Sequence, residues 1–206
     1  MTWAASKSMT WAVETESATK VPSDIIHASQ KHTNSICWAE EVTTATVADG
    51  IAAAAGFNQP FLIRSADCLP LVLLTADTAC ALHVSRKSLP AGLLDKVSGF
   101  LDVTAITRVH IGPHVCPEHF VFAWRGEELA AFCDIYPMAC APAAGGTSVS
   151  LRAAVDYYLQ QWGVREENVT RDGRCTFESR ELPSYRRSLR DGEKLAGNIY
   201  TIVRRA

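Results

Sequence analysis

Four short apolar segments follow one another in the first half of the chain, and this succession constrains the fold more than any other feature. Turn-forming residues separate them, at Gly56, at Asn58–Pro60 and at Ala76–Thr78. Short apolar runs bounded by Gly, Pro, Asn and Asp predict β-strands. The four predicted strands are Ile51–Ala55, Phe61–Arg64, Leu69–Leu74 and Cys80–His83. Their close spacing predicts a sheet.

Helical periodicity follows this predicted sheet. Apolar residues recur at helical spacing in Leu89–Leu101, Glu127–Phe132 and most clearly Leu151–Trp162, which Ser148 or Ser150 can cap and Gly163 can end. Further strands are predicted at Ile25–Ala28, Ser35–Trp38, Val109–Ile111, Phe120–Ala123, Asn168–Arg171 and Asn198–Val203. The alternation of short strands and occasional helices predicts an α+β domain with a mixed sheet.

Length and composition predict a single globular domain. The chain has 206 residues, 48% of them hydrophobic, which is enough for one substantial core. We expect this domain to span residues 23–206, after a variable segment of small and polar residues, 1–22. The net charge of −2 and the scattered basic residues disfavour nucleic-acid binding. No apolar stretch reaches the ~18 residues of a membrane span and no signal-peptide pattern is present, so we expect a soluble, cytoplasmic protein.

The seven cysteines are an odd number in a chain without a CxxC pair, which makes a disulfide framework unexpected. Cys80 and Cys133 sit within apolar runs and are interpreted as small core residues. His110, His114 and His119 surround Cys116 at spacings that suggest a metal site. They alternate across a predicted strand and turn, however, so we do not expect them to converge.

Cys68 differs from the other cysteines because it interrupts two apolar runs. The polar pair Asp67-Cys68 separates two predicted strands, and His83 ends a third strand fifteen residues after the cysteine. This arrangement can bring a thiol and an imidazole together at the ends of neighbouring strands. Such a pair can act as nucleophile and base, or as two ligands of a metal ion.

Four motifs resemble those of one family, known variously as laccase-like multicopper polyphenol oxidases, purine nucleoside phosphorylases and peptidoglycan editing factors. Ser65–Val72 reads SADCLPLV and is close to the family's TADCLPV segment. Gln30–His32 resembles its QxH segment, Ile111–Pro113 its IGPC segment, and Ser184–Arg187 its FSYRRD ending. The motifs occur in the family's order, from about Ile26 to Val203. The chain is similar to a divergent member.

The resemblance implies a single-domain α+β fold with two packed mixed sheets flanked by helices, a four-layer sandwich. It also implies a zinc site formed by His32, Cys68 and His83. Two imidazoles and one thiolate are suitable zinc ligands, although copper can also occupy such a site. Three protein ligands leave a fourth position open, and zinc there can lower the pKa of water to roughly 7.

The activity implied by the resemblance is zinc-dependent phosphorolysis of purine nucleosides (adenosine, inosine and methylthioadenosine), with accompanying adenosine deamination. The small-molecule partners are then a purine nucleoside and phosphate. Phosphorolysis needs cationic groups beside the ribose, and the candidates are Arg64, Lys87, Arg186 and Arg187. Cys68, His83 and Asp67 are the catalytic candidates, with Asp67 as a proton-transfer group or a partner of a metal ligand.

Three alternatives remain open from the sequence. Cys68 as thiolate and His83 as base can cleave an amide without metal, which fits a peptidoglycan-editing role. Copper-dependent phenol oxidation is weaker because the chain lacks the recurring HxH pairs of a multicopper cluster. A binding protein that keeps the ligands but has lost turnover is the third alternative.

The loop after His83 departs from the family pattern. Where the family has HAGWRGL, this chain reads HVSRKSL, so both glycines and the tryptophan are replaced. Lys87 stands where the family has arginine, which preserves the charge but not the planar fork that binds phosphate through two hydrogen bonds. His114 replaces the cysteine of IGPC. These changes predict a remodelled substrate pocket beside a retained metal site.

Overall fold

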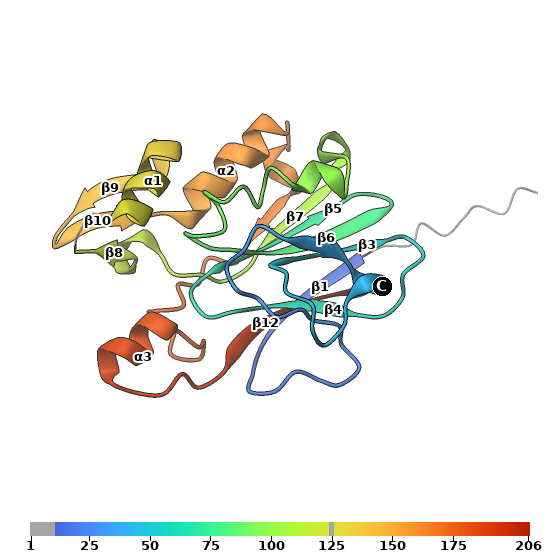
Figure 1. Ribbon diagram of the computed structural model, residues 1–206, viewed down its shortest axis with the longest axis horizontal. Coiled ribbons are helices and arrows are strands. Elements are labelled where there is room, and N and C mark those ends of the chain that lie inside the picture. Colours follow the sequence, from blue (N-terminus) through green and yellow to red (C-terminus); the bar gives the residue numbers. More distant parts are fainter. Residues whose placement is uncertain (1–10, 124–125) are drawn as a thin grey trace, which may run out of the picture.

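The computed structural model describes residues 11–123 and 126–206, so the first ten residues of the variable amino-terminal segment lie outside the described part. Three sheets and three α-helices form an α+β domain in the described part (Figure 1). The largest sheet is mixed and has the order β11 (Val169–Arg171), β7 (Arg108–Ile111), β5 (Leu69–Leu74), β6 (Thr78–Val84), β3 (Gly50–Ala54) and β2 (Ile36–Trp38).

The two smaller sheets are antiparallel. One has the order β1 (Trp11–Ala18), β12 (Asn198–Arg205) and β4 (Phe61–Ser65), and the other β8 (Val121–Phe122), β10 (Gly146–Val149) and β9 (Cys140–Ala143). The expectation of a mixed sheet is confirmed for the large sheet, whereas the expectation of two mixed sheets is wrong, because the described residues form three sheets and the smaller two are antiparallel. The third sheet is built from strands of two to four residues, which are too short to give an alternating pattern in the sequence.

Strand β5 is buried on both faces, which explains its continuous apolar sequence. Leu71 and Leu73 face a core shared with the helices, whereas Val72 and Leu74 face a second core shared with Phe61 of β4. Figure 1 shows α1 and α2 on one side of the large sheet and the sheet β1–β12–β4 on the other. The middle of the domain is therefore a sheet between two hydrophobic cores.

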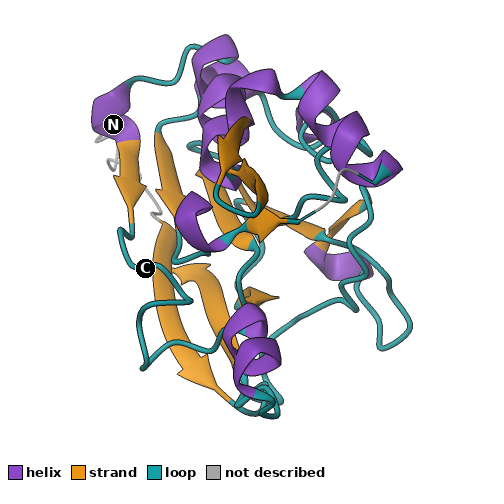
Figure 2. Ribbon diagram, turned by 90° about the vertical axis from the view of Figure 1, so that its left-hand side faces the viewer, coloured by secondary structure: helices purple, strands orange, loops and turns teal. Residues whose placement is uncertain are grey.

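Three α-helices occur in the described residues: α1 (Glu127–Ile135), α2 (Leu151–Gln161) and α3 (Tyr185–Asp191). The side chain of Ser150 accepts a hydrogen bond from Ala153 N and caps α2, as predicted. Figure 2 shows most helical turns gathered on one side of the strands and one helix apart from them at the bottom. No helix of the described chain combines the length and hydropathy needed to cross a membrane.

Six short 3-10 helices complete the described elements: η1 (Ala39–Glu41), η2 (Val97–Gly99), η3 (Val103–Ala105), η4 (Pro117–His119), η5 (Pro137–Ala139) and η6 (Glu166–Asn168). The predicted helix Leu89–Leu101 is wrong, because this segment consists of turns and η2. Gly92 has φ 87°, which breaks an α-helix after one turn. Its apolar positions, among them Leu93 and Val97, are nevertheless fully buried.

The amino-terminal part of the domain differs from the sequence interpretation in two places. The predicted strand Ile25–Ala28 reduces to a single bridge between Ile26 and Phe61. Residues 11–18, within the variable segment, instead form β1, which pairs along its whole length with β12. Trp11 is buried against Phe61, so this edge strand contributes to the core.

Cys80 is fully buried, as expected of a small core residue, but Cys133 is not a free thiol. Cys133 at the end of α1 forms a disulfide with Cys140 at the start of β9. The turn η5 reverses the chain between them and brings the two Cα atoms to 5.6 Å. A separation of seven residues between Cys133 and Cys140 does not by itself predict a disulfide.

Candidate metal centre

Cys68 lies at a corner where the chain passes from one sheet to another. Strand β4 belongs to the three-stranded sheet and β5 to the large sheet, with Ala66–Cys68 between them. Asp67 has φ 95°, a conformation that a non-glycine residue rarely adopts. Its buried carboxylate accepts hydrogen bonds from Thr176 Oγ1 and from the backbone N of Arg186, both at 2.6 Å. These contacts hold the strained corner that presents Cys68.

His83 is fixed by a buried aspartate just before β3. Strand β3 pairs with β6, and His83 N donates to the carbonyl of Asp49 at 2.7 Å. Nδ1 of His83 also lies 2.8 Å from Asp49 Oδ1. Since Asp49 is completely buried, the position of His83 is determined by a carboxylate that water does not reach.

The same carboxylate shapes the turn that carries His32. The backbone N atoms of Lys31, His32 and Thr33 donate to Asp49 at 3.2, 3.0 and 2.6 Å. His32 has φ 60°, so this turn also holds a non-glycine residue in the left-handed region. Asp49 therefore positions both histidines of the candidate site.

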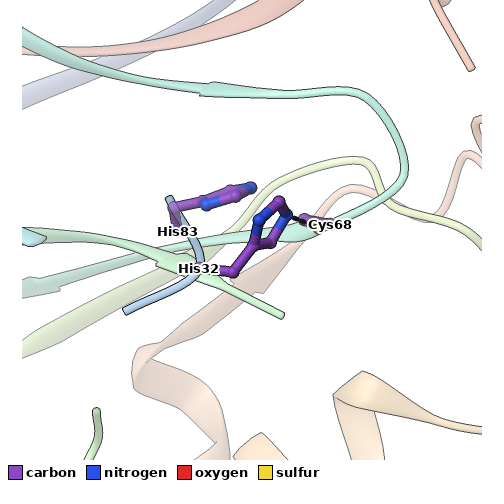
Figure 3. A group of neighbouring side chains, drawn as sticks. All are labelled: His32, Cys68 and His83. Atoms are coloured by element: carbon purple, nitrogen blue, oxygen red, sulfur yellow. Dashed lines mark hydrogen bonds between the residues drawn. The ribbon is translucent and has the colours of Figure 1, made fainter. Parts of the chain in front are cut away.

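The three side chains converge as expected. Figure 3 shows His32, Cys68 and His83 pointing toward one another from three separate segments. Their ligand atoms lie within 4.8 Å of one another, and Cys68 Sγ is 3.8 Å from His32 Nε2. A sulfur and a nitrogen bound to one tetrahedral zinc ion are about 3.6 Å apart. With Nδ1 engaged by Asp49, Nε2 of His83 remains for the metal, so these residues fit zinc.

The cluster shifts the pKa values of its members in opposite directions. Burial raises the pKa of Cys68, but the charge of His83 and hydrogen bonds from both histidines outweigh it and lower this pKa to about 7. Burial lowers the pKa of His83, yet Cys68 and Asp49 raise it to about 9. Burial raises the pKa of Asp49, but hydrogen bonds from His83 and Thr33 lower it to about 2. Without metal, Cys68 and His83 therefore favour a thiolate–imidazolium pair.

The cluster lines an open cleft of about 1100 Å³. Aromatic rings of Phe120, Phe122, Phe177 and Tyr185 also line it, together with the cations Arg64, Arg86, Lys87, Arg186 and Arg190. Apolar rings beside a few convergent charges are typical of a small-molecule site. The cleft can therefore bind a flat, partly anionic molecule next to the candidate metal position.

The four predicted anion-binding residues are not placed alike. Arg64, Lys87 and Arg186 line the cleft, and the guanidinium of Arg186 stacks on the rings of Phe120 and Phe122, 4.6 Å from each centroid. Arg186 also donates to the backbone carbonyls of His119 and Val121. Arg187 lies outside the described cleft lining and donates to four backbone carbonyls, those of Thr176, Phe177, Ser179 and Leu182. Arg187 thus stabilises the loop before α3.

The altered loop after His83 is stabilised by its own serines. Ser85 and Ser88 are buried, and their hydroxyls lie 3.0 Å apart. Arg86 and Lys87 both bind the Glu128 carboxylate, at 3.0 and 3.3 Å, and Arg86 also lies over the Phe122 ring. The two serines close the turn through hydrogen bonds to each other, and Arg86 lines the cleft.

Sequence reasoning missed Asp49 and Arg86. Asp49 follows a polar stretch and precedes Gly50, so nothing local distinguishes it from a surface carboxylate. Its partners lie 16 to 34 residues away, and the pairing of β3 with both β2 and β6 brings them together. Arg86 lies in the segment that departs from the family motif, which was the one available signal.

Comparisons with known proteins agree with this fold. The model of a family described as multi-copper polyphenol oxidoreductase laccase matches residues 11–205. The Neisseria meningitidis protein NMB0706 is 23% identical, with a TM-score of 0.72 over 88% of this chain and 74% of that one.

Two further solved structures resemble the chain. Bacillus licheniformis hypothetical protein YfiH is 19% identical, with a TM-score of 0.70 over 88% of this chain and 74% of that one. YlmD from Geobacillus stearothermophilus is 18% identical, with a TM-score of 0.71 over 88% and 73%. No curated protein matches the sequence.

Proposed function

The chain belongs to the multi-copper polyphenol oxidoreductase laccase family, and we propose that it is a zinc-dependent purine nucleoside phosphorylase with accompanying adenosine deaminase activity. The observation that carries the proposal is the convergence of His32, Cys68 and His83 in a cleft lined by aromatic rings and cations. The substrates would be adenosine, inosine or methylthioadenosine, together with phosphate.

The cleft offers a different surface to each part of such a substrate. A purine is flat and can stack on aromatic rings or on planar guanidinium groups. The cleft holds both, since Arg86, Arg186 and Arg190 lie over the rings of Phe120, Phe122 and Phe177. Phosphate is an anion, and Arg64, Lys87 and Arg186 line the same cleft. In phosphorolysis the bond between purine and ribose breaks, a phosphate oxygen bonds to the ribose carbon, and the purine leaves with a proton. Held cations lower the barrier by orienting the phosphate and balancing its charge.

The metal ligands and Asp49 have separate tasks in this proposal. When bound, zinc supplies an electrophilic centre with one position free for water or substrate. Asp49 accepts the Nδ1 hydrogen of His83, which orients the ring and leaves Nε2 as the donor atom. Asp67 has both carboxylate oxygens engaged, by Thr176 and Arg186, so it acts by holding the Cys68 corner rather than by moving a proton.

The proposal is tested by incubating zinc-loaded protein with inosine or adenosine, with and without phosphate, and measuring base release. We expect release that depends on phosphate and is lost in Cys68→Ala. Cys37→Ala is the matched control, because Cys37 is also a partly buried free thiol but lies in β2. Parallel loading with copper and a phenol substrate distinguishes oxidation. No release by the wild type, or undiminished release by Cys68→Ala, contradicts the proposal.

A second candidate function is metal-free cleavage of an amide by Cys68 and His83. The thiol pKa of about 7 beside an imidazole favours this alternative, since a thiolate is the attacking form in cysteine hydrolases. Metal content separates the two functions. Zinc held through dialysis supports the phosphorylase, whereas a metal-free protein whose Cys68 is rapidly alkylated supports the hydrolase. Nucleoside binding without turnover would identify a binding protein.

A further inference from the structure

A second group of metal-binding side chains lies outside the His32–Cys68–His83 site. Cys116, Cys175 and Glu178 offer two sulfurs and a carboxylate oxygen that all lie within 4.8 Å of one another. Both cysteines are free thiols. The histidines that surround Cys116 in the sequence, His110, His114 and His119, are not members of this group. The two cysteines come from loops 59 residues apart, so only the fold brings them together.

Backbone contacts hold the two loops in this arrangement. Cys116 follows β7 and Cys175 follows β11, and a parallel bridge joins His114 to Cys175. Thr176 N donates to the carbonyl of His114 at 3.1 Å. Cys116 N donates to Cys175 Sγ at 3.2 Å. This contact holds the Cys175 sulfur beside the loop that carries Cys116.

Glu178 is oriented by a neighbouring histidine. His119 Nε2 lies 3.1 Å from Glu178 Oε1, and the His119 ring stacks on Phe177 at 4.3 Å. A metal-binding carboxylate is commonly held by such a second hydrogen bond, which fixes its direction. The carboxylate is therefore positioned by a contact that leaves its other oxygen for a cation.

We propose that Cys116, Cys175 and Glu178 bind a second zinc ion. Two thiolates and a carboxylate match the preference of zinc for sulfur and oxygen ligands in a four-coordinate site. Cys116 and Cys175 also line a separate pocket of about 390 Å³, which gives the ion an entry path and leaves room for water as the fourth ligand. On binding, the two thiols release their protons to solvent.

The second zinc ion would fasten the loop that supports the Cys68 corner. Thr176 directly follows Cys175 and donates to the Asp67 carboxylate at 2.6 Å. Cys116 directly follows Val115, whose backbone N donates to the Asp67 carbonyl at 3.0 Å. A cation that ties Cys116 to Cys175 therefore fixes two of the partners of Asp67, Thr176 and Val115. This role is independent of the proposed phosphorylase activity.

The test is to load metal-stripped, reduced protein with excess zinc, desalt it and measure zinc per chain by elemental mass spectrometry. We expect two zinc ions in the wild type, one in Cys116→Ser and two in the control Cys37→Ser. His32→Ala should lose the first ion and keep the second, so failure of one site is distinguishable from failure of the other.

Glu178→Gln keeps the inference falsifiable if Cys116→Ser fails to fold, because the Glu178 side chain is 62% exposed and its change leaves the core intact. We expect this variant to bind the second zinc at least tenfold more weakly, as measured by competition with a chelator. A zinc content in Cys116→Ser equal to that of the wild type overturns the inference, whether or not the His32 site is filled. Two tightly bound ions in Cys116→Ser, or a Cys116–Cys175 disulfide that leaves one zinc after reduction, also overturn it.

Discussion

Asp49 Oδ1 accepts a hydrogen bond from Nδ1 of His83 at 2.8 Å and another from the backbone N of His32 at 3.0 Å. One buried carboxylate thus connects two candidate metal ligands that lie 51 residues apart in the sequence. The geometry of the site therefore depends on a residue that does not belong to the ligand set itself.

Replacing Asp49 should weaken metal binding although no ligand is removed. In Asp49→Asn the amide cannot accept every hydrogen bond of the carboxylate, so the ring of His83 and the turn of His32 lose their orientation. We expect zinc affinity to fall about 10- to 100-fold, measured by competition with a chelator. Asp77→Asn, an exposed aspartate in a turn, is the control. Equal affinities for the two variants would exclude this role.

Asp49 should also make the metal-free protein sensitive to acid. Its folded pKa of about 2 lies below its ordinary value of 3.8, so the stabilisation is present above pH ~4 and is lost as the pH falls toward 2. The contribution is about 2 kcal/mol. Urea unfolding of metal-free protein at a series of acidic pH values measures it. Asp49→Asn should be less stable at pH ~4 and show a smaller decline; an equally steep decline contradicts the assignment.

Cys68 should be reactive near neutral pH in the metal-free protein. Its pKa of about 7 places the thiolate transition two units below the ordinary value of 9.0. The alkylation rate of Cys68, followed by peptide mass spectrometry, should reach half its maximum near pH 7. His83→Ala should move this midpoint upward, because the imidazole charge is removed. Cys80, buried with a pKa raised to about 12, serves as the unreactive internal control.

Replacing Arg187 should lower the stability of the protein, whereas replacing Arg186 should mainly affect phosphate binding. Arg187→Met removes the donors of four backbone carbonyls, so we expect a loss of about 3 kcal/mol in unfolding free energy, measured by urea denaturation, with little change in zinc affinity. Arg186→Met should raise the KM for phosphate if the proposed activity is present. Equal stability losses in both variants would contradict the distinction.

Most strands and the α2 helix could be predicted because their signals are local. Segments such as Leu69–Leu74 are apolar, short and bounded by turn residues, and Ser150 marks the start of α2. Leu89–Leu101 shows the limit of this reasoning. Its spacing correctly identified buried residues, but Gly92 in the left-handed region made the segment a series of turns. The pattern reports which side chains are buried, and the backbone can achieve that burial without a helix.

The sequence by itself determined the α+β class of the fold, because strand and helix patterns are local, and its resemblance to one family identified His32, Cys68 and His83 as candidate ligands. Tertiary structure decided what connects them. The pairing of β3 with β6 places Asp49 beside His83. Arg187 donates hydrogen bonds to backbone carbonyls, and the backbone N of Cys116 contacts the sulfur of Cys175 in another loop. The contacts of Asp49 and of Cys116 join residues that are far apart in the sequence, and a local sequence pattern carries no information about such contacts.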